Sequence, residues 1–118
     1  MELKVIERMV LLNVLPVTGT LINLRLVREL REGLSFSDEE NQSLAFKNEN
    51  GKIFWDDTDE VAKDVEISAT MMDLVIGAFG VLDVEAKLHL DQIGVFERFL
   101  MEKGDREARV KDMVDGKG

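Results

Sequence analysis

Apolar residues recur at helical spacing between residues 20 and 34. At 100° per residue they form one broad arc, with charged side chains opposite. The arc consists of Ile22, Leu24, Leu26, Val27, Leu30 and Leu34. Gly33 is typical of the left-handed residue that closes a helix, and Ser37 with Glu40 matches the capping box that begins one. The pattern predicts a core-facing helix that ends near Gly33 and a short helix from Ser37.

The pattern of residues 3–14 predicts an earlier helix. Its predicted main apolar face is Val5, Ile6, Met9 and Leu12, with Glu7 and Arg8 outside. Because the later turns are apolar nearly all round, this helix either lies under other elements or supplies a subunit interface that includes Met9 and Leu12. Pro16 closes the helix, since a residue before proline avoids helical geometry.

Residues 44–56 carry the clearest local signal. Asn50-Gly51 is a favoured pair for a two-residue type I′ turn, which places Glu49 opposite Lys52 and Phe46 opposite Trp55. We expect one face of this hairpin to pack on the helices, with Phe46 and Trp55 in the core. Further predictions are a short helical turn over residues 58–63 and a third strand at residues 65–67 beside the hairpin.

Residues 69–82 form the most apolar segment. As a helix it is about 21 Å long, short of the roughly 30 Å core of a bilayer, so it predicts a buried helix capped by Ser68. Ala69, Asp73, Gly77 and Gly80 form a stripe of small or polar residues on it, and either another element of the chain or a second copy can approach there.

The last helix is predicted over residues 90–102. Its predicted core-facing residues are Leu90, Ile93, Phe96, Phe99 and Leu100. We expect Gly104 to end it and residues 105–118 to form a charged, flexible tail. Residues 1–104 then make one compact α+β domain, helical with a small antiparallel sheet built on the hairpin. A winged-helix-like arrangement is compatible with this order.

The net charge of −9 is concentrated in the middle of the chain, where residues 35–68 carry three basic and ten acidic side chains. This balance disfavours direct binding to nucleic acid or to an anionic membrane, because both require positive charge. Without cysteine, disulfide and thiolate chemistry are excluded, and a reducing cytoplasmic location is the expectation. The first residues lack the basic region and cleavage site of a signal peptide.

Catalytic motifs are missing from the sequence. There is one histidine, no tyrosine and no cysteine, and neither a phosphate loop nor metal-ligand spacing is present. The acidic run of residues 56–60 lacks the central glycine of an EF-hand loop. We therefore expect no enzymatic activity, cofactor or metal.

The runs ERMVLLNVLP and LRLVRELREGLSFSDEEN, followed by a hairpin ending in FWDD, resemble small acidic proteins of phage and prophage genomes. The resemblance covers about the first half of the chain. It implies a virion or assembly component, or an inhibitor of a host protein.

Together these features predict a non-enzymatic protein–protein interaction module, an assembly or regulatory component of phage type. Its partner is expected to be a protein, basic where it meets the acidic surface. That surface comprises Asp38, Glu39, Glu40, Asp56, Asp57, Asp59 and Glu60. One alternative is an inhibitor that mimics nucleic acid through these carboxylates. Another is a winged-helix-like regulator.

The working form is expected to be a homodimer, because the apolar surface exceeds what one short domain readily covers. The candidate interface residues are Met9, Leu12, Gly77 and Gly80.

Overall fold

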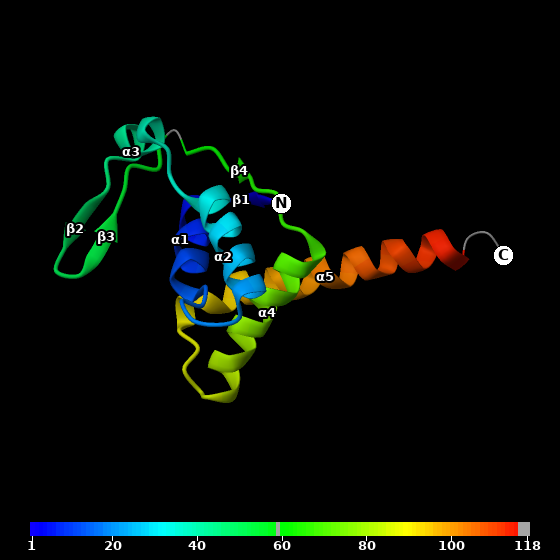
Figure 1. The fold of residues 1–118 in the computed structure, drawn as a ribbon. Helices are drawn as coiled ribbons and strands as arrows, with labels where there is room; N and C mark the ends of the chain where they lie inside the picture. Colours follow the sequence, from blue (N-terminus) through cyan, green and yellow to red (C-terminus); the bar gives the residue numbers. More distant parts are fainter. Residues whose placement is uncertain (59, 116–118) are drawn as a thin grey trace.

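Five helices and two short antiparallel sheets make up the part of the chain that the computed structural model describes, residues 1–58 and 60–115 (Figure 1). In chain order the elements are β1 (Glu2–Leu3), α1 (Val5–Val14), α2 (Leu21–Leu34), α3 (Asp38–Leu44), β2 (Lys47–Glu49), β3 (Lys52–Phe54), β4 (Lys63–Asp64), α4 (Ala69–Val84) and α5 (Leu90–Asp115). This confirms the α+β class predicted from the sequence.

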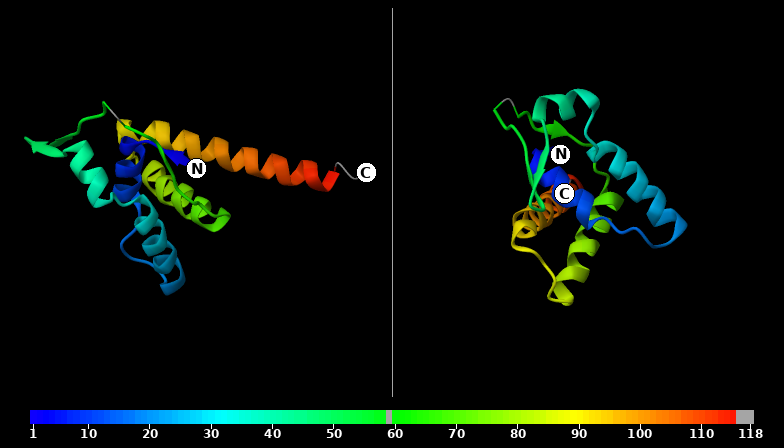
Figure 2. Two further views of the ribbon diagram at one scale, coloured as in Figure 1. Left: turned by 90° about the horizontal axis from the view of Figure 1, so that it is seen from above. Right: turned by 90° about the vertical axis from the view of Figure 1, so that its left-hand side faces the viewer.

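The core lies where α1, α2, α4 and the first half of α5 meet (Figure 2). Its fully buried side chains include Leu11 of α1, Leu30 of α2, Phe79 of α4 and Phe99 of α5. Phe79 also stacks on Phe96, with ring centroids 5.0 Å apart. Four helices thus share one apolar centre with Leu3 of β1, and the β2–β3 hairpin lies outside it.

The buried face of α1 differs from the predicted one. Val5, Arg8, Val10 and Leu11 are buried, whereas Ile6 is exposed. A helix that is apolar nearly all round gives no periodic signal for its orientation, so its packing partners decide which side is covered. The expectation that Arg8 lies outside is therefore wrong.

α2 ends at Leu34, which confirms the predicted helix end near Gly33, but Gly33 is part of the helix and the predicted left-handed conformation there is wrong. Gly33 is instead a packing residue, because a Cβ there would lie 3.2 Å from Val65 Cγ1. Val27, Leu30 and Leu34 are buried as expected, but Ile22 is exposed. The next helix, α3, begins with the predicted capping box of Ser37 and Glu40.

The β2–β3 hairpin has the predicted register, with Glu49 opposite Lys52 and a turn in which Asn50 and Gly51 have positive φ. The predicted packing against the helices is wrong. All six strand residues are exposed, and the hairpin stands off from the helical body (Figure 1). Phe46 and Trp55 are half-buried at its base and lie outside the core.

The predicted third strand does not join the hairpin. β4 pairs with β1 near the start of the chain, where Glu2 faces Asp64 and Leu3 faces Lys63. Val65 and Ile67 follow β4 and enter the helical core. The predicted helical turn over residues 58–63 is also wrong, because after a single turn hydrogen bond from the Glu60 N–H to the Asp57 carbonyl at 3.2 Å the chain is extended or irregular.

The predicted helix capped by Ser68 is present as α4. α5 exceeds its prediction, because it continues through Gly104 to Asp115 and its end projects as an arm beyond the body (Figure 2). The expected helix end at Gly104 is therefore wrong, while the flexibility of residues 105–115 stays a prediction. Residues 116–118 lie outside the described part. Leu90, Ile93 and Leu100 are exposed, and Val95 takes a core position in their place.

Candidate protein-binding surfaces

The buried guanidinium of Arg8 fixes the base of the hairpin. Its Nε donates to the Leu34 carbonyl at 3.0 Å, and its Nη2 donates to the Ser35 carbonyl at 2.6 Å. Both nitrogens of the fork also donate to Glu40, with Nη2 3.2 Å from Oε1. An arginine that is 1% exposed is tolerated because these acceptors replace its water. Arg8 thereby joins α1 to the end of α2 and the start of α3.

Glu40 has two roles in this arrangement. Its Oε1 accepts from the Ser37 backbone N–H at 3.1 Å, which completes the capping box of α3. Its hydrogen bond from Arg8 lowers the pKa of the carboxyl from 4.5 to about 2. Glu40 therefore stays ionised over the whole physiological range and holds α3 against α1.

An aromatic row continues from Arg8 into the hairpin. The guanidinium carbon of Arg8 lies 4.0 Å from the ring centroid of Phe36. Phe36 packs edge-on against Phe46, with ring centroids 5.1 Å apart, and the ring centroids of Phe46 and Trp55 are 6.3 Å apart. The strands are supported further by the Asp56 backbone N–H, which donates to the Leu44 carbonyl at 2.7 Å. These contacts anchor the hairpin at one end only.

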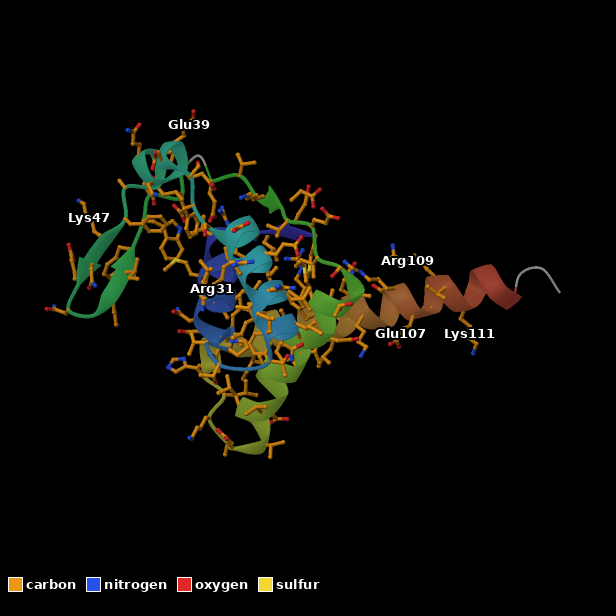
Figure 3. All side chains as sticks on the ribbon, viewed as in Figure 1. Arg31, Glu39, Lys47, Glu107, Arg109 and Lys111 are labelled. Carbon is orange, nitrogen blue, oxygen red and sulfur yellow. The ribbon has the colours of Figure 1, made fainter. Side chains whose placement is uncertain are left out.

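The free part of the hairpin presents apolar side chains to solvent. Ile53 is 46% exposed and Phe54 is 50% exposed. Because neighbouring side chains alternate in a strand, Ile53 shares the face of Trp55, while Phe54 shares the opposite face with Lys47. Figure 3 shows Lys47 pointing outward from this hairpin. Lys47 and Lys52 minus Glu49 give this segment a charge of +1 within an acidic chain.

The predicted acidic surface is only partly free. Glu40 is paired with Arg8, and Glu60 Oε1 accepts from the Val5 backbone N–H at 3.0 Å at the start of α1. The Asp56 carboxylate accepts from the backbone and the hydroxyl of Thr58, which lowers its pKa. Three of the seven carboxylates are thus engaged within the fold.

The remaining four acidic residues do not lie together on one element. Asp38 and Glu39 are exposed on α3, and Asp57 is exposed after the hairpin. Figure 3 shows Glu39 pointing away from the body. Asp59 lies outside the described residues. The structure therefore does not bring the predicted set together as one free array.

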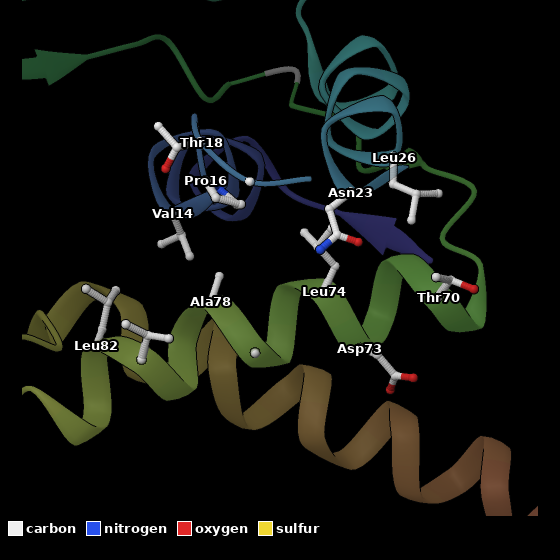
Figure 4. A pocket seen from close by; sticks show the side chains of 13 residues that line it. Val14, Pro16, Thr18, Asn23, Leu26, Thr70, Asp73, Leu74, Ala78 and Leu82 are labelled. Carbon is white, nitrogen blue, oxygen red and sulfur yellow. The ribbon is translucent and has the colours of Figure 1, made fainter. Parts of the chain in front are cut away.

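A groove of about 590 Å³ lies between α4 and the connection from α1 to α2 (Figure 4). Two adjacent rows of α4 form one wall, at the four-residue spacing that places side chains on one face. The rows are Thr70, Leu74, Ala78 and Leu82, and Asp73, Gly77 and Val81. Val14, Pro16, Thr18, Gly19, Asn23 and Leu26 line the other side.

Charge is nearly missing from this groove. Asp73 is the one charged side chain among the described residues that line it, and Figure 4 shows it pointing away, toward α5. There it lies 3.0 Å from Lys103 Nζ, and this pairing raises the pKa of Lys103. The exposed part of the groove is therefore neutral and mostly apolar.

Two of the four predicted interface residues lie on α1 and two on α4. Met9 and Leu12 are half-buried, and Leu12 packs against the core. Gly77 is exposed in the groove, and a Cβ built on Gly77 or Gly80 has no heavy atom within 4 Å. The glycines of α4 are thus open to another molecule and do not serve as a crossing point for another helix of this chain.

The described residues hold no group of three or more His, Asp or Glu side chains placed to bind a metal ion. His89 is exposed, and its backbone N–H donates to Gln92 Oε1 at the start of α5. In the described part of the chain, no helix combines the length and the apolarity that a bilayer crossing requires. Comparison with protein-family models, curated proteins and solved structures gives no significant match.

Sequence reasoning missed both Arg8 and the groove. Arg8 carries an available signal, because it is the one basic residue within the apolar run of residues 5–12. The groove has a signal as well, since residues 9–24 and 74–82 contain no charged side chain. Only the fold reveals that these two uncharged runs face each other.

Proposed function

We propose that this chain is a non-enzymatic protein-binding module that docks its partner through the β2–β3 hairpin. The observation that carries the proposal is that all six strand residues of the hairpin are exposed, among them the apolar Ile53 and Phe54. An isolated two-stranded hairpin is at best marginally stable in water. This one is held at its base, so it offers a positioned but uncovered surface to a partner.

The composition of the hairpin supports binding to protein. Trp55, Phe54 and Phe46 belong to the residue types enriched in the centres of interfaces. The charge of +1 over residues 46–55 suits an apolar cleft with one or two carboxylates at its rim. A basic partner would instead meet the acidic residues of α3. The resemblance to phage and prophage proteins favours an assembly or regulatory role.

Nucleic-acid mimicry has less support. A mimic needs its carboxylates fixed in an accessible array, but Glu40 and Glu60 bind groups within the fold. Asp38, Glu39 and Asp57 remain exposed for such a role. The two functions differ in their response to salt, because binding through phosphate-like charges weakens steeply as ionic strength rises.

The test compares partners captured from an extract of the source cells and quantified by mass spectrometry. The hairpin variant carries Ile53→Ser and Phe54→Ser, and its matched control carries Val84→Ser and Val110→Ser, two exposed apolar residues outside the hairpin. Binding through the hairpin predicts partners that are lost from the first variant, kept by the second and retained at high salt. Loss of at least 2 kcal/mol, or about 30-fold in affinity, is expected for an apolar anchor.

A third variant addresses the alternative with Asp38→Asn, Glu39→Gln and Asp57→Asn. If the wild-type chain binds its partners at low salt and releases them at high salt, and if this variant alone fails to bind them at low salt, mimicry is correct and hairpin docking is wrong. Trp55 is the only tryptophan, so a purified partner that covers the hairpin must change its fluorescence. Turnover of a small molecule by the pure protein would refute the non-enzymatic assignment.

A further inference from the structure

A second surface is left uncovered at a different end of the molecule from the hairpin. It consists of the groove on α4 and the neighbouring Ile22, and we refer to it as the groove face (Figures 1 and 4). Ile22 is 72% exposed. It lies four residues before Leu26, which lines the groove, so it stands on the same side of α2 one turn beyond it.

The charge distribution restricts what this face can bind. A chain of net charge −9 repels its own copies unless the touching surfaces carry no free carboxylate. The groove face meets this condition, since most of its lining comes from the uncharged runs 9–24 and 74–82, Leu26 and Thr70 carry no charge, and Asp73 turns to Lys103. Two copies can therefore meet here without placing like charges in contact.

The face is also complementary to itself in shape. Ile22 and Val81 project as exposed apolar side chains, whereas Gly77 lies in the groove and an added Cβ there would enter open space. A two-fold axis makes each contact twice, so one patch must supply both the projection and the groove. The groove face supplies both.

The chain exposes more surface than a compact monomer of its mass. A compact monomer of 13.4 kDa is expected to expose about 6,500 Å², whereas this chain exposes 8389 Å². The surplus is about 1,900 Å², and a stable interface covers about 800 Å² on each partner. The projecting hairpin and the end of α5 contribute to this surplus together with the groove face.

We infer that the chain forms a two-fold homodimer through the groove face, with Ile22 of one copy directed into the groove at Gly77 of the other. The hairpins lie away from this contact and remain free in both copies (Figure 1). A dimer presents two of them, which raises the avidity for a repetitive partner without any new contact.

The first test is the mass in solution by light scattering and sedimentation across a wide concentration range. The variant Gly77→Glu places a carboxylate in the interface, and its matched control is Gly94→Glu on α5. Both glycines are exposed in helices with open space at Cβ, so neither change disturbs the monomer. We expect Gly77→Glu to weaken the dimer by about 100-fold or more and Gly94→Glu to leave it unchanged.

A second test does not depend on how a substitution changes the stability of the folded monomer. The chain has no cysteine, so any disulfide in a single-cysteine variant joins two copies. Under mild oxidation Val81→Cys should give a covalent dimer at low protein concentration, and Gly94→Cys should not. Equal cross-linking of both variants would overturn the inference.

The inference also fails if the wild-type chain is a 13.4 kDa monomer at all concentrations, or if its dimer is indifferent to Gly77→Glu. Each of these results leaves the hairpin proposal intact, because partner capture by a monomer needs no groove face. Conversely, a dimer that is sensitive to Gly77→Glu supports this inference even when the hairpin variant keeps every partner.

Discussion

Arg8 of α1 and Glu40 of α3 form a salt bridge across 32 residues of sequence, with the arginine 1% exposed and the glutamate partly covered. Glu40 caps α3, Arg8 stacks on Phe36, and Phe36 leads through Phe46 to the hairpin. One ion pair thus connects the helical body to the element that we propose to bind a partner.

Removing Arg8 should destabilise the whole fold. Arg8→Ala leaves Glu40 without its cation and two backbone carbonyls without their donor, so we expect a loss of about 3–5 kcal/mol in the free energy of unfolding. Chemical denaturation measures it. The control is Arg28→Ala on the exposed face of α2, which should change stability by no more than about 0.5 kcal/mol. Equal effects would contradict the role of Arg8.

Acid should weaken the fold through Glu40. Its pKa falls from 4.5 to about 2 on folding, so the unfolded chain binds more protons between these values. This stabilisation is complete above about pH 5 and is lost as pH falls toward 2. Glu40→Gln should flatten that part of the stability curve, whereas Glu39→Gln, on the same turn of α3, should leave it. Identical curves for wild type and Glu40→Gln would exclude this linkage.

Replacement of glycine by alanine should lower stability in the hairpin turn and raise it in a helix. Gly51 has φ +81°, so Gly51→Ala should cost about 1–2 kcal/mol within the hairpin. Gly94 lies in α5 with open space, and Gly94→Ala should gain about 0.5–1 kcal/mol. Amide exchange in β2 and β3 reports the first change and global denaturation the second. A turn unaffected by Gly51→Ala would speak against the type I′ geometry.

The length of α5 can be tested at Gly104. Gly104→Pro should cost about 3 kcal/mol in helix propensity and end the helix, which lowers the circular dichroism signal at 222 nm. Arg106 loses its 2.7 Å contact with the Ile67 carbonyl in that variant. Gly104→Ala should preserve or raise the signal. If the proline variant keeps its full signal, the helix ends near Gly104 in solution, as the sequence pattern predicts.

Local features were predictable where the sequence pattern that specifies them spans only a few residues. The capping box of Ser37 and Glu40, the Asn50-Gly51 turn with its register, and the Ser68 cap of α4 all depend on short-range geometry. Each is specified by backbone conformations and hydrogen bonds between near neighbours. These elements therefore appear where the pattern places them.

Arrangements that need a distant partner were not predictable. Val65 follows a strand that pairs with β1 and then packs at Gly33, and nothing near it in sequence indicates either contact. The end of α5 was not predictable either, because the sequence around Gly104 alone is typical of a helix end. There Arg106 reaches the Ile67 carbonyl and the helix continues.

The sequence by itself determined where the five helices lie along the chain, the hairpin and the acidic balance of this protein, because each follows from periodicity, turn chemistry or composition. Tertiary structure decided which side of α1 is buried, where Arg8 finds its acceptors, and that two uncharged runs line one groove. Burial of a guanidinium is favourable only when acceptors from other elements replace its water. That condition depends on the assembled fold and cannot be read from neighbouring residues.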